Sequence, residues 1–110
     1  MTISLPEKLA AYFAAVNKRD VAGMLAQFGE DAFVHDEGEE MRGHAAIRSW
    51  IVKTTGKYGI TADIQGVDAI GQALRVSAQV AGTFPGSPIV LHYDFTLGAD
   101  GEIIRLEIGL

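Results

Sequence analysis

Cysteine is absent from the sequence, and basic side chains are few. Without cysteine the chain has no disulfide, no thiolate metal site and no cysteine nucleophile. Nine Lys and Arg residues stand against fourteen Asp and Glu, which gives a formal net charge of −5. Nucleic-acid binders need a basic surface to displace counterions from phosphates, so we expect no nucleic-acid partner.

Long apolar runs are also lacking. No run approaches the roughly 20 residues needed to cross a bilayer, so we expect no membrane partner. Residues 1–7 have neither the basic start nor the apolar centre of a secretory signal peptide. The 110 residues are 48% hydrophobic and 21% charged, which is typical of one globular domain. We therefore expect a single domain over residues 1–110 in a soluble, cytoplasmic protein.

Helical periodicity occupies the first half of the chain. Ser4 and Glu7 have the spacing of a capping box, and Asp20 is a good N-cap for a second, shorter helix that ends at Gly29. A third helix is expected from about His44 to Tyr58, with Gly59 as its C-cap. The apolar faces consist of Leu5, Leu9, Tyr12, Phe13 and Val16 in the first helix, Val21, Met24, Leu25 and Phe28 in the second, and Ile47, Trp50, Ile51, Thr54 and Tyr58 in the third.

Period-two alternation indicates strands. A short strand over 32–36 places Ala32, Val34 and Asp36 on one face, and a brief strand is expected at Met41-Arg42. Further strands are expected over 60–70, with a bulge at Gly66, and over 74–84, 89–97 and the last residues. Their inward positions are Leu74, Val76, Ala78, Val80, Gly82 and Phe84, then Leu91, Tyr93, Phe95 and Leu97, and finally Ile104, Leu106 and Ile108.

Helices followed by an antiparallel meander predict an α+β fold, with three N-terminal helices on one face of the sheet. A sheet that curls around helices can leave a pocket between them, and the small inward residues Ala78 and Gly82 would leave space there. The alternative is that these small residues let Trp50 or Phe13 pack closely and that the interior is filled.

Three segments resemble the nuclear transport factor 2-like superfamily, and within it the SnoaL-like group of polyketide cyclases and ketosteroid isomerases. They are Tyr12-Phe13-Ala14-Ala15-Val16-Asn17 leading to Asp20, then Phe28-x-Glu30-Asp31-Ala32-x-Val34-x-Asp36, then Arg42-Gly43-x-x-Ala46-Ile47. The resemblance covers nearly the whole chain and implies a cone-shaped, cystatin-like fold with a strongly curved, mostly antiparallel sheet. The superfamily hosts enzymes and binding modules alike, so the resemblance alone does not fix a function.

The resemblance to the isomerases implies a catalytic pair. A helix-one tyrosine that donates to the substrate oxyanion falls on Tyr12, and a proton-shuttling aspartate at the end of the first strand falls on Asp36. The third residue of that site is an aspartic acid, whereas the last hairpin aligns Tyr93 there. A tyrosine can still donate a hydrogen bond, so the site is altered without being abolished. This chemistry implies no cofactor.

Around this pair we expect a small apolar ligand. Each candidate also has a purely structural interpretation: Asp36 as a solvated carboxylate, and Tyr12 and Tyr93 as core tyrosines. The chain then either transfers a proton on a small carbonyl compound, as an isomerase or cyclase does, or serves as a non-catalytic ligand-binding or dimerisation domain. The expected ligand-binding residues are Phe13, Val34, Trp50, Tyr58, Ala78, Gly82, Phe84, Phe95 and Leu106.

Polar residues on the opposite phase of the late strands predict a patch on the outer face of the sheet. It comprises His92, Asp94, Arg105 and Glu107. Because members of the superfamily that the chain resembles often dimerise, the resemblance implies that this patch meets a second copy of the chain in a homodimer; the alternative is a solvated surface. His35, Asp36, Glu37 and His44 suggest a metal site, but neighbours on a strand point to opposite faces and no tight histidine pair exists, so no metal is expected.

Overall fold

Helices form at the three stretches with helical periodicity. In the computed structural model, which describes residues 5–110, Asp20 caps the second helix by accepting a hydrogen bond from the Gly23 N–H at 3.0 Å. Gly59 ends the third helix in the left-handed region, at φ 54°. Both caps are as predicted, whereas the capping box predicted at Ser4 lies outside the described residues. The helices are α1 (Glu7–Lys18), α2 (Val21–Leu25) and α3 (Gly43–Tyr58).

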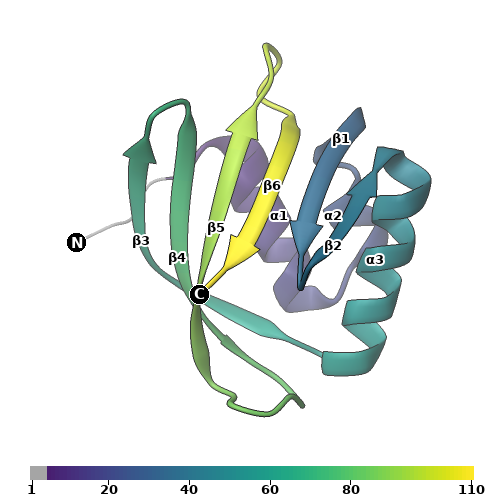
Figure 1. Cartoon of the computed structure of the whole chain (residues 1–110), viewed down its shortest axis with the longest axis vertical. Coiled ribbons are helices and arrows are strands. Elements are labelled where there is room, and N and C mark those ends of the chain that lie inside the picture. Colours follow the sequence, from purple (N-terminus) through teal and green to yellow (C-terminus); the bar gives the residue numbers. More distant parts are fainter. Residues whose placement is uncertain (1–4) are drawn as a thin grey trace.

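In residues 5–110, six strands form one sheet in the order β2-β1-β6-β5-β4-β3. All neighbours are antiparallel except β1 and β6, which run parallel. The three helices lie on one side of the sheet, and α3 runs beside β1 and β2 (Figure 1). This confirms the predicted α+β class with a mostly antiparallel sheet. The strands are β1 (Phe28–Asp36), β2 (Glu39–Arg42), β3 (Thr61–Ile70), β4 (Ala73–Ala81), β5 (Ile89–Leu97) and β6 (Ile103–Gly109).

The core lies between the helices and the inward face of the sheet. Val34, Val76, Phe95 and Leu106 are fully buried there, each from a different strand, as the alternation predicted. The predicted bulge at Gly66 is also present, as a shift of register between Ile64 and Gly66 on β3. None of the helices in residues 5–110 has the length and apolarity that a bilayer-spanning helix requires.

Two predictions about the elements are wrong: where the second helix ends, and which residues of the last strand face inward. The second helix ends at Leu25, and Phe28 starts β1, where its burial comes from the sheet. On β6 the predicted inward residue Ile104 is 42% exposed, whereas its neighbour Ile103 is fully buried. The cause is a change of register: Phe95 pairs with Leu106, but Leu97 pairs with Ile103, so β6 accommodates one extra residue and its phase reverses.

Candidate functional site

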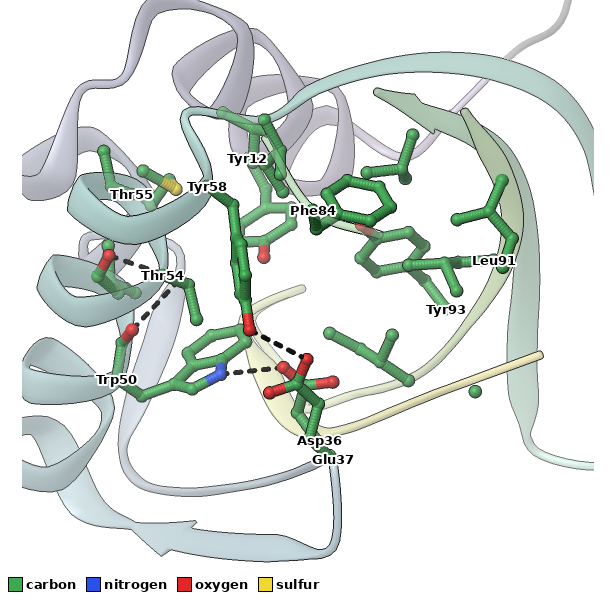
Figure 2. Close-up of a pocket in the computed structure, with 18 of the residues that line it drawn as sticks. Tyr12, Asp36, Glu37, Trp50, Thr54, Thr55, Tyr58, Phe84, Leu91 and Tyr93 are labelled. Carbon is green, nitrogen blue, oxygen red and sulfur yellow. Dashed lines mark hydrogen bonds between the residues drawn. The ribbon is translucent and has the colours of Figure 1, made fainter. Parts of the chain in front are cut away.

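A pocket of about 550 Å³ opens between the helices and the concave face of the sheet (Figure 2). Its walls are mostly apolar, which is the usual character of a small-molecule site. α1 and α3 supply one side, the end of β1 supplies the polar edge, and β4, β5 and the loop between them supply the other side. The lining includes Tyr12, Val16, Trp50, Ile51, Thr54, Tyr58, Val80, Phe84, Leu91, Tyr93 and Ile108.

Asp36 is the last residue of β1, and its inward phase brings its carboxylate to this pocket. The Trp50 indole N–H donates to its Oδ2 atom at 3.0 Å, which fixes the orientation of the carboxylate (Figure 2). Burial raises the pKa of Asp36 above its ordinary value, and the nearby charges of Glu37 and Glu39 raise it further. The Trp50 hydrogen bond and His35 act in the opposite direction. The result is a carboxylate with a stronger affinity for a proton than a solvated one has.

Glu37 brings a second carboxylate to the pocket. The sequence suggested this residue only as a member of a metal cluster, which strand geometry argued against. Glu37 occupies the left-handed region at φ 53°, in a two-residue turn with Gly38 that joins β1 to β2. Tyr58 donates from its hydroxyl to Glu37 Oε1 at 3.4 Å (Figure 2). Both central residues of such a turn need positive φ. The pairing of Asp36 with Glu39 is the signal that would have located the turn.

Tyr12 and Tyr93 supply two phenols from opposite walls, α1 and β5. Each residue is only 3% exposed, and both rings contact Phe13 edge to face, with ring centroids 5.2 Å apart in each pair. Within residues 5–110 no buried side-chain polar atom lacks a partner, and neither hydroxyl makes a hydrogen bond to protein. Both hydroxyls therefore face the open space of the pocket, free to donate to a ligand.

Burial is the main influence on the pKa of both phenols. Burial raises the pKa of Tyr12 well above its ordinary value, and Tyr93 and Asp36 add to the effect through their charges. Burial likewise raises the pKa of Tyr93, with a further contribution from Asp36. Both phenols thus stay protonated at neutral pH and act as hydrogen-bond donors.

The expected ligand-binding residues divide into two groups. Trp50, Tyr58 and Phe84 line the pocket, whereas six others do not. Phe13, for example, packs against Phe95 in the layer where α1 meets the sheet directly, so its ring supports the pocket wall from behind. The structure therefore corrects the expected placement of Phe13, Val34, Ala78, Gly82, Phe95 and Leu106 along the pocket.

Gly82 has a different function from the one expected. It follows β4, which ends at Ala81, and a Cβ atom there would lie 2.6 Å from the Tyr58 carbonyl oxygen. The glycine thus allows the β4–β5 loop to approach the end of α3, where the Thr83 N–H donates to the same carbonyl at 2.9 Å. This contact brings Phe84 against Tyr58, with ring centroids 5.8 Å apart.

The outer face of the sheet carries the predicted polar patch. His35, Glu107, Asp94 and Arg75 are paired in turn across β1, β6, β5 and β4, forming one polar row. Arg75 donates two hydrogen bonds to Asp94, at 2.8 and 3.0 Å. Arg105 bonds to Glu107 on the same face. Across the described chain, no group of three or more His, Asp or Glu side chains is arranged to hold a metal ion.

Comparisons with known proteins identify the family and the fold. The model of the SnoaL-like domain family matches residues 9–106. A "putative polyketide cyclase" from Sinorhizobium meliloti is similar at 38% identity and a TM-score of 0.89, over 96% of this chain and 95% of that one. No match was found among curated proteins.

Two more distant structures share the fold. One is a hypothetical protein from Catenulispora acidiphila with a ketosteroid isomerase-like fold, solved in complex with trimethylamine, at 19% identity and a TM-score of 0.82 over 97% of this chain and 87% of that one. The other is a "putative isomerase" of the SnoaL-like family from Agrobacterium tumefaciens, at 19% identity and a TM-score of 0.71 over 92% of each chain.

Proposed function

The chain belongs to the SnoaL-like domain family, and on that premise we propose that its pocket transfers a proton on a small, mostly apolar carbonyl compound. The reaction is an isomerisation or a cyclisation and requires no cofactor. One observation supports it above all: the Asp36 carboxylate and the free hydroxyls of Tyr12 and Tyr93 line the same pocket. A base and two hydrogen-bond donors are the groups that enolisation requires.

In the proposed reaction, the Asp36 carboxylate removes a proton from the carbon next to the substrate carbonyl. The electron pair of that C–H bond forms a double bond to the carbonyl carbon, and the π electrons of the carbonyl move onto its oxygen, which gives an enolate. Tyr12 and Tyr93 donate hydrogen bonds to this oxygen, where the negative charge develops. The neutral Asp36 carboxyl then returns the proton to a different carbon, which completes the isomerisation and regenerates the carboxylate.

The surroundings of Asp36 suit this task. A base works best when its pKa lies near the working pH, and burial raises the pKa of Asp36 in that direction. Trp50 acts as a positioning residue, because its indole N–H holds one carboxylate oxygen and leaves the other available for the proton. The walls are mostly apolar, and a hydrogen bond is electrostatically stronger in such surroundings than in water.

The proposal is tested with 3-cyclohexen-1-one, whose conversion to the conjugated 2-cyclohexen-1-one is followed by ultraviolet absorbance. Asp36→Asn keeps an acceptor for Trp50 but removes the base, and we expect a loss of about 10²–10⁴-fold in rate. Tyr12→Phe removes one donor and should cost about 10²–10³-fold. Asp63→Asn, at an exposed site on β3, is the matched control and should keep full activity.

A second readout avoids dependence on one substrate. Exchange of α-protons for deuterium in a panel of cyclic ketones, followed by NMR in D₂O, reports proton transfer even where no isomer forms. Full activity of Asp36→Asn in either assay would disprove the assignment of the base. A wild-type protein that binds the ketones without exchanging their protons would instead be a non-catalytic ligand-binding domain.

A further inference from the structure

We propose that the pocket also binds small organic cations, with an alkylammonium group seated against Asp36 and Glu37 and its apolar substituents against the aromatic walls. This inference goes beyond the proposed function and does not depend on it, because it concerns the charge of the ligand and requires no reaction. Four features of the pocket support it: its paired carboxylates, its aromatic lining, its unbalanced charge and its free phenols.

The two carboxylates converge because of the turn that contains Glu37. Side chains of adjacent residues on a strand point to opposite faces, so Asp36 and Glu37 would normally diverge. Here β1 ends at Asp36, and Glu37 adopts a left-handed conformation at φ 53°. Both residues therefore line the same pocket, and Figure 2 shows both of them at its polar edge. A backbone conformation that is costly for glutamate is typical of functional sites.

Aromatic rings make up much of the remaining wall. Tyr12, Trp50, Tyr58, Phe84 and Tyr93 all line the pocket and come from α1, α3, the β4–β5 loop and β5 (Figure 2). Tyr58 and Phe84 meet edge to face at 82°, so their rings present differently oriented surfaces. Aromatic faces attract ammonium groups through their quadrupoles, and cages of this kind recognise quaternary ammonium ligands.

The charges of the pocket do not balance without a ligand. Its charged lining residues are Asp36, Glu37 and Arg19. Arg19 donates to the Gly59 carbonyl at 2.8 Å, near the end of α3. Within residues 5–110 no Lys or Arg forms a salt bridge with Asp36 or Glu37; the nearby Lys53 pairs with Glu39. The protein donors to these carboxylates are the neutral groups of Trp50 and Tyr58. A bound cation supplies the missing positive charge.

The phenols give the ligand a second point of attachment. Tyr12 and Tyr93 are each only 3% exposed, and their hydroxyls have no protein partner within the described residues. A hydroxyl carried on a short chain from the ammonium group can bond to them. Choline has this combination of a quaternary ammonium and a hydroxyl, and it is small for a pocket of about 550 Å³.

The test compares choline with 3,3-dimethylbutan-1-ol, which has the same shape but no charge. Binding of each is measured by isothermal titration calorimetry and by NMR shifts of the wild-type protein at low salt. We expect choline to bind at least about 10-fold more tightly than the neutral alcohol, and the difference to shrink as salt is added. Equal affinities for the two compounds, or no detectable binding of choline, would overturn the proposal without reference to any variant.

Variants then locate the cation. Glu37→Gln and Asp36→Asn each remove one charge and should weaken choline binding several-fold, while leaving binding of the neutral alcohol unchanged. Glu40→Gln removes the same charge from β2 of the same hairpin, at an exposed position that does not line the pocket. Equal weakening by Glu40→Gln would mean that choline responds only to the overall acidity of the hairpin, which would also overturn the proposal.

Discussion

At the scale of single residues, the contact between Trp50 and Asp36 connects packing to chemistry. Trp50 is 8% exposed and belongs to the core cluster, yet its indole N–H reaches the carboxylate in the pocket. The hydrogen bond favours the charged form of Asp36, whereas burial favours the neutral form, and burial is the larger effect. The balance between the two determines how strongly Asp36 holds a proton.

Trp50→Phe tests this balance. The variant keeps an aromatic ring but removes the N–H, so the pKa of Asp36 should rise further above its ordinary value. A base must be deprotonated to act, so the proposed activity of the wild-type protein should be lost as pH falls through the pKa of Asp36. In the variant this acid limb of the pH–rate profile should move to higher pH. An acid limb at unchanged pH would show that the indole has no electrostatic effect on the base.

At the scale of elements, the turn between β1 and β2 is strained because a glutamate occupies a position suited to asparagine or glycine. Type I′ turns require positive φ at both central residues, and Gly38 meets that requirement at φ 76° whereas Glu37 does not do so readily. The turn therefore lowers the stability of the protein somewhat, while it places the Glu37 carboxylate in the pocket.

Glu37→Asn should relieve the strain. Asparagine tolerates the left-handed region, so we expect the free energy of unfolding to rise by about 0.5–1 kcal/mol, measured by urea denaturation. The same change should weaken choline binding, because it removes the charge. Glu40→Asn, on the neighbouring strand and without positive φ, is the control and should not stabilise the protein. An unchanged stability in Glu37→Asn would mean that the turn stores little strain.

Most helices and strands, but not all of their details, could be predicted from the sequence. Periodicity predicted the three helices, the inward phase of β4 and β5, and the inward phase of Asp36. Each of these depends only on the local pattern of apolar residues. Periodicity failed on β6, where an extra residue reverses the phase at Ile104, since bulges depend on pairing with β5. It also missed the placement of Glu37 in the pocket, because a two-residue turn is recognised only after its two strands are paired.

Sequence patterns also could not separate the residues of the pocket wall from those of the core. The sequence pattern predicts that Trp50 and Phe13 are both large inward residues, but only Trp50 lines the pocket. The distinction depends on how far each helix stands from the sheet, which three-dimensional packing decides. Sequence patterns identify the inward face, and they do not show where that face is covered.

At the scale of the whole molecule, the outer face of the sheet remains uncovered by helices (Figure 1). We propose that it pairs with a second copy of the chain. Its polar row carries both signs of charge, negative at Glu107 and Asp94 and positive at Arg75. Exposed Val90 and Ile104, on β5 and β6, add apolar surface. Both features are suited to a symmetric contact.

The dimer is tested by sedimentation equilibrium. His92 lies on β5 opposite Ser77, and His92→Glu adds a negative charge near Asp94 and Glu107. Symmetry would place this charge twice in one interface, so we expect a wild-type dimer and a largely monomeric variant. Lys18→Glu changes charge at an exposed position on α1, on the helical side of the molecule, and should remain dimeric. A wild-type monomer would contradict the proposal.

The parallel pairing of β1 with β6 has a consequence for synthesis of the chain. Phe28 pairs with Ile103 and Val34 with Leu106, so each contact joins residues about 70 positions apart. During translation β1 emerges early, whereas β6, its inner neighbour in the sheet, follows the other five strands in the described chain. Until then the strand that carries Asp36 has an unpaired edge, which is a site for aggregation. The sheet beside the proposed active site can therefore be completed only after β6 has been synthesised.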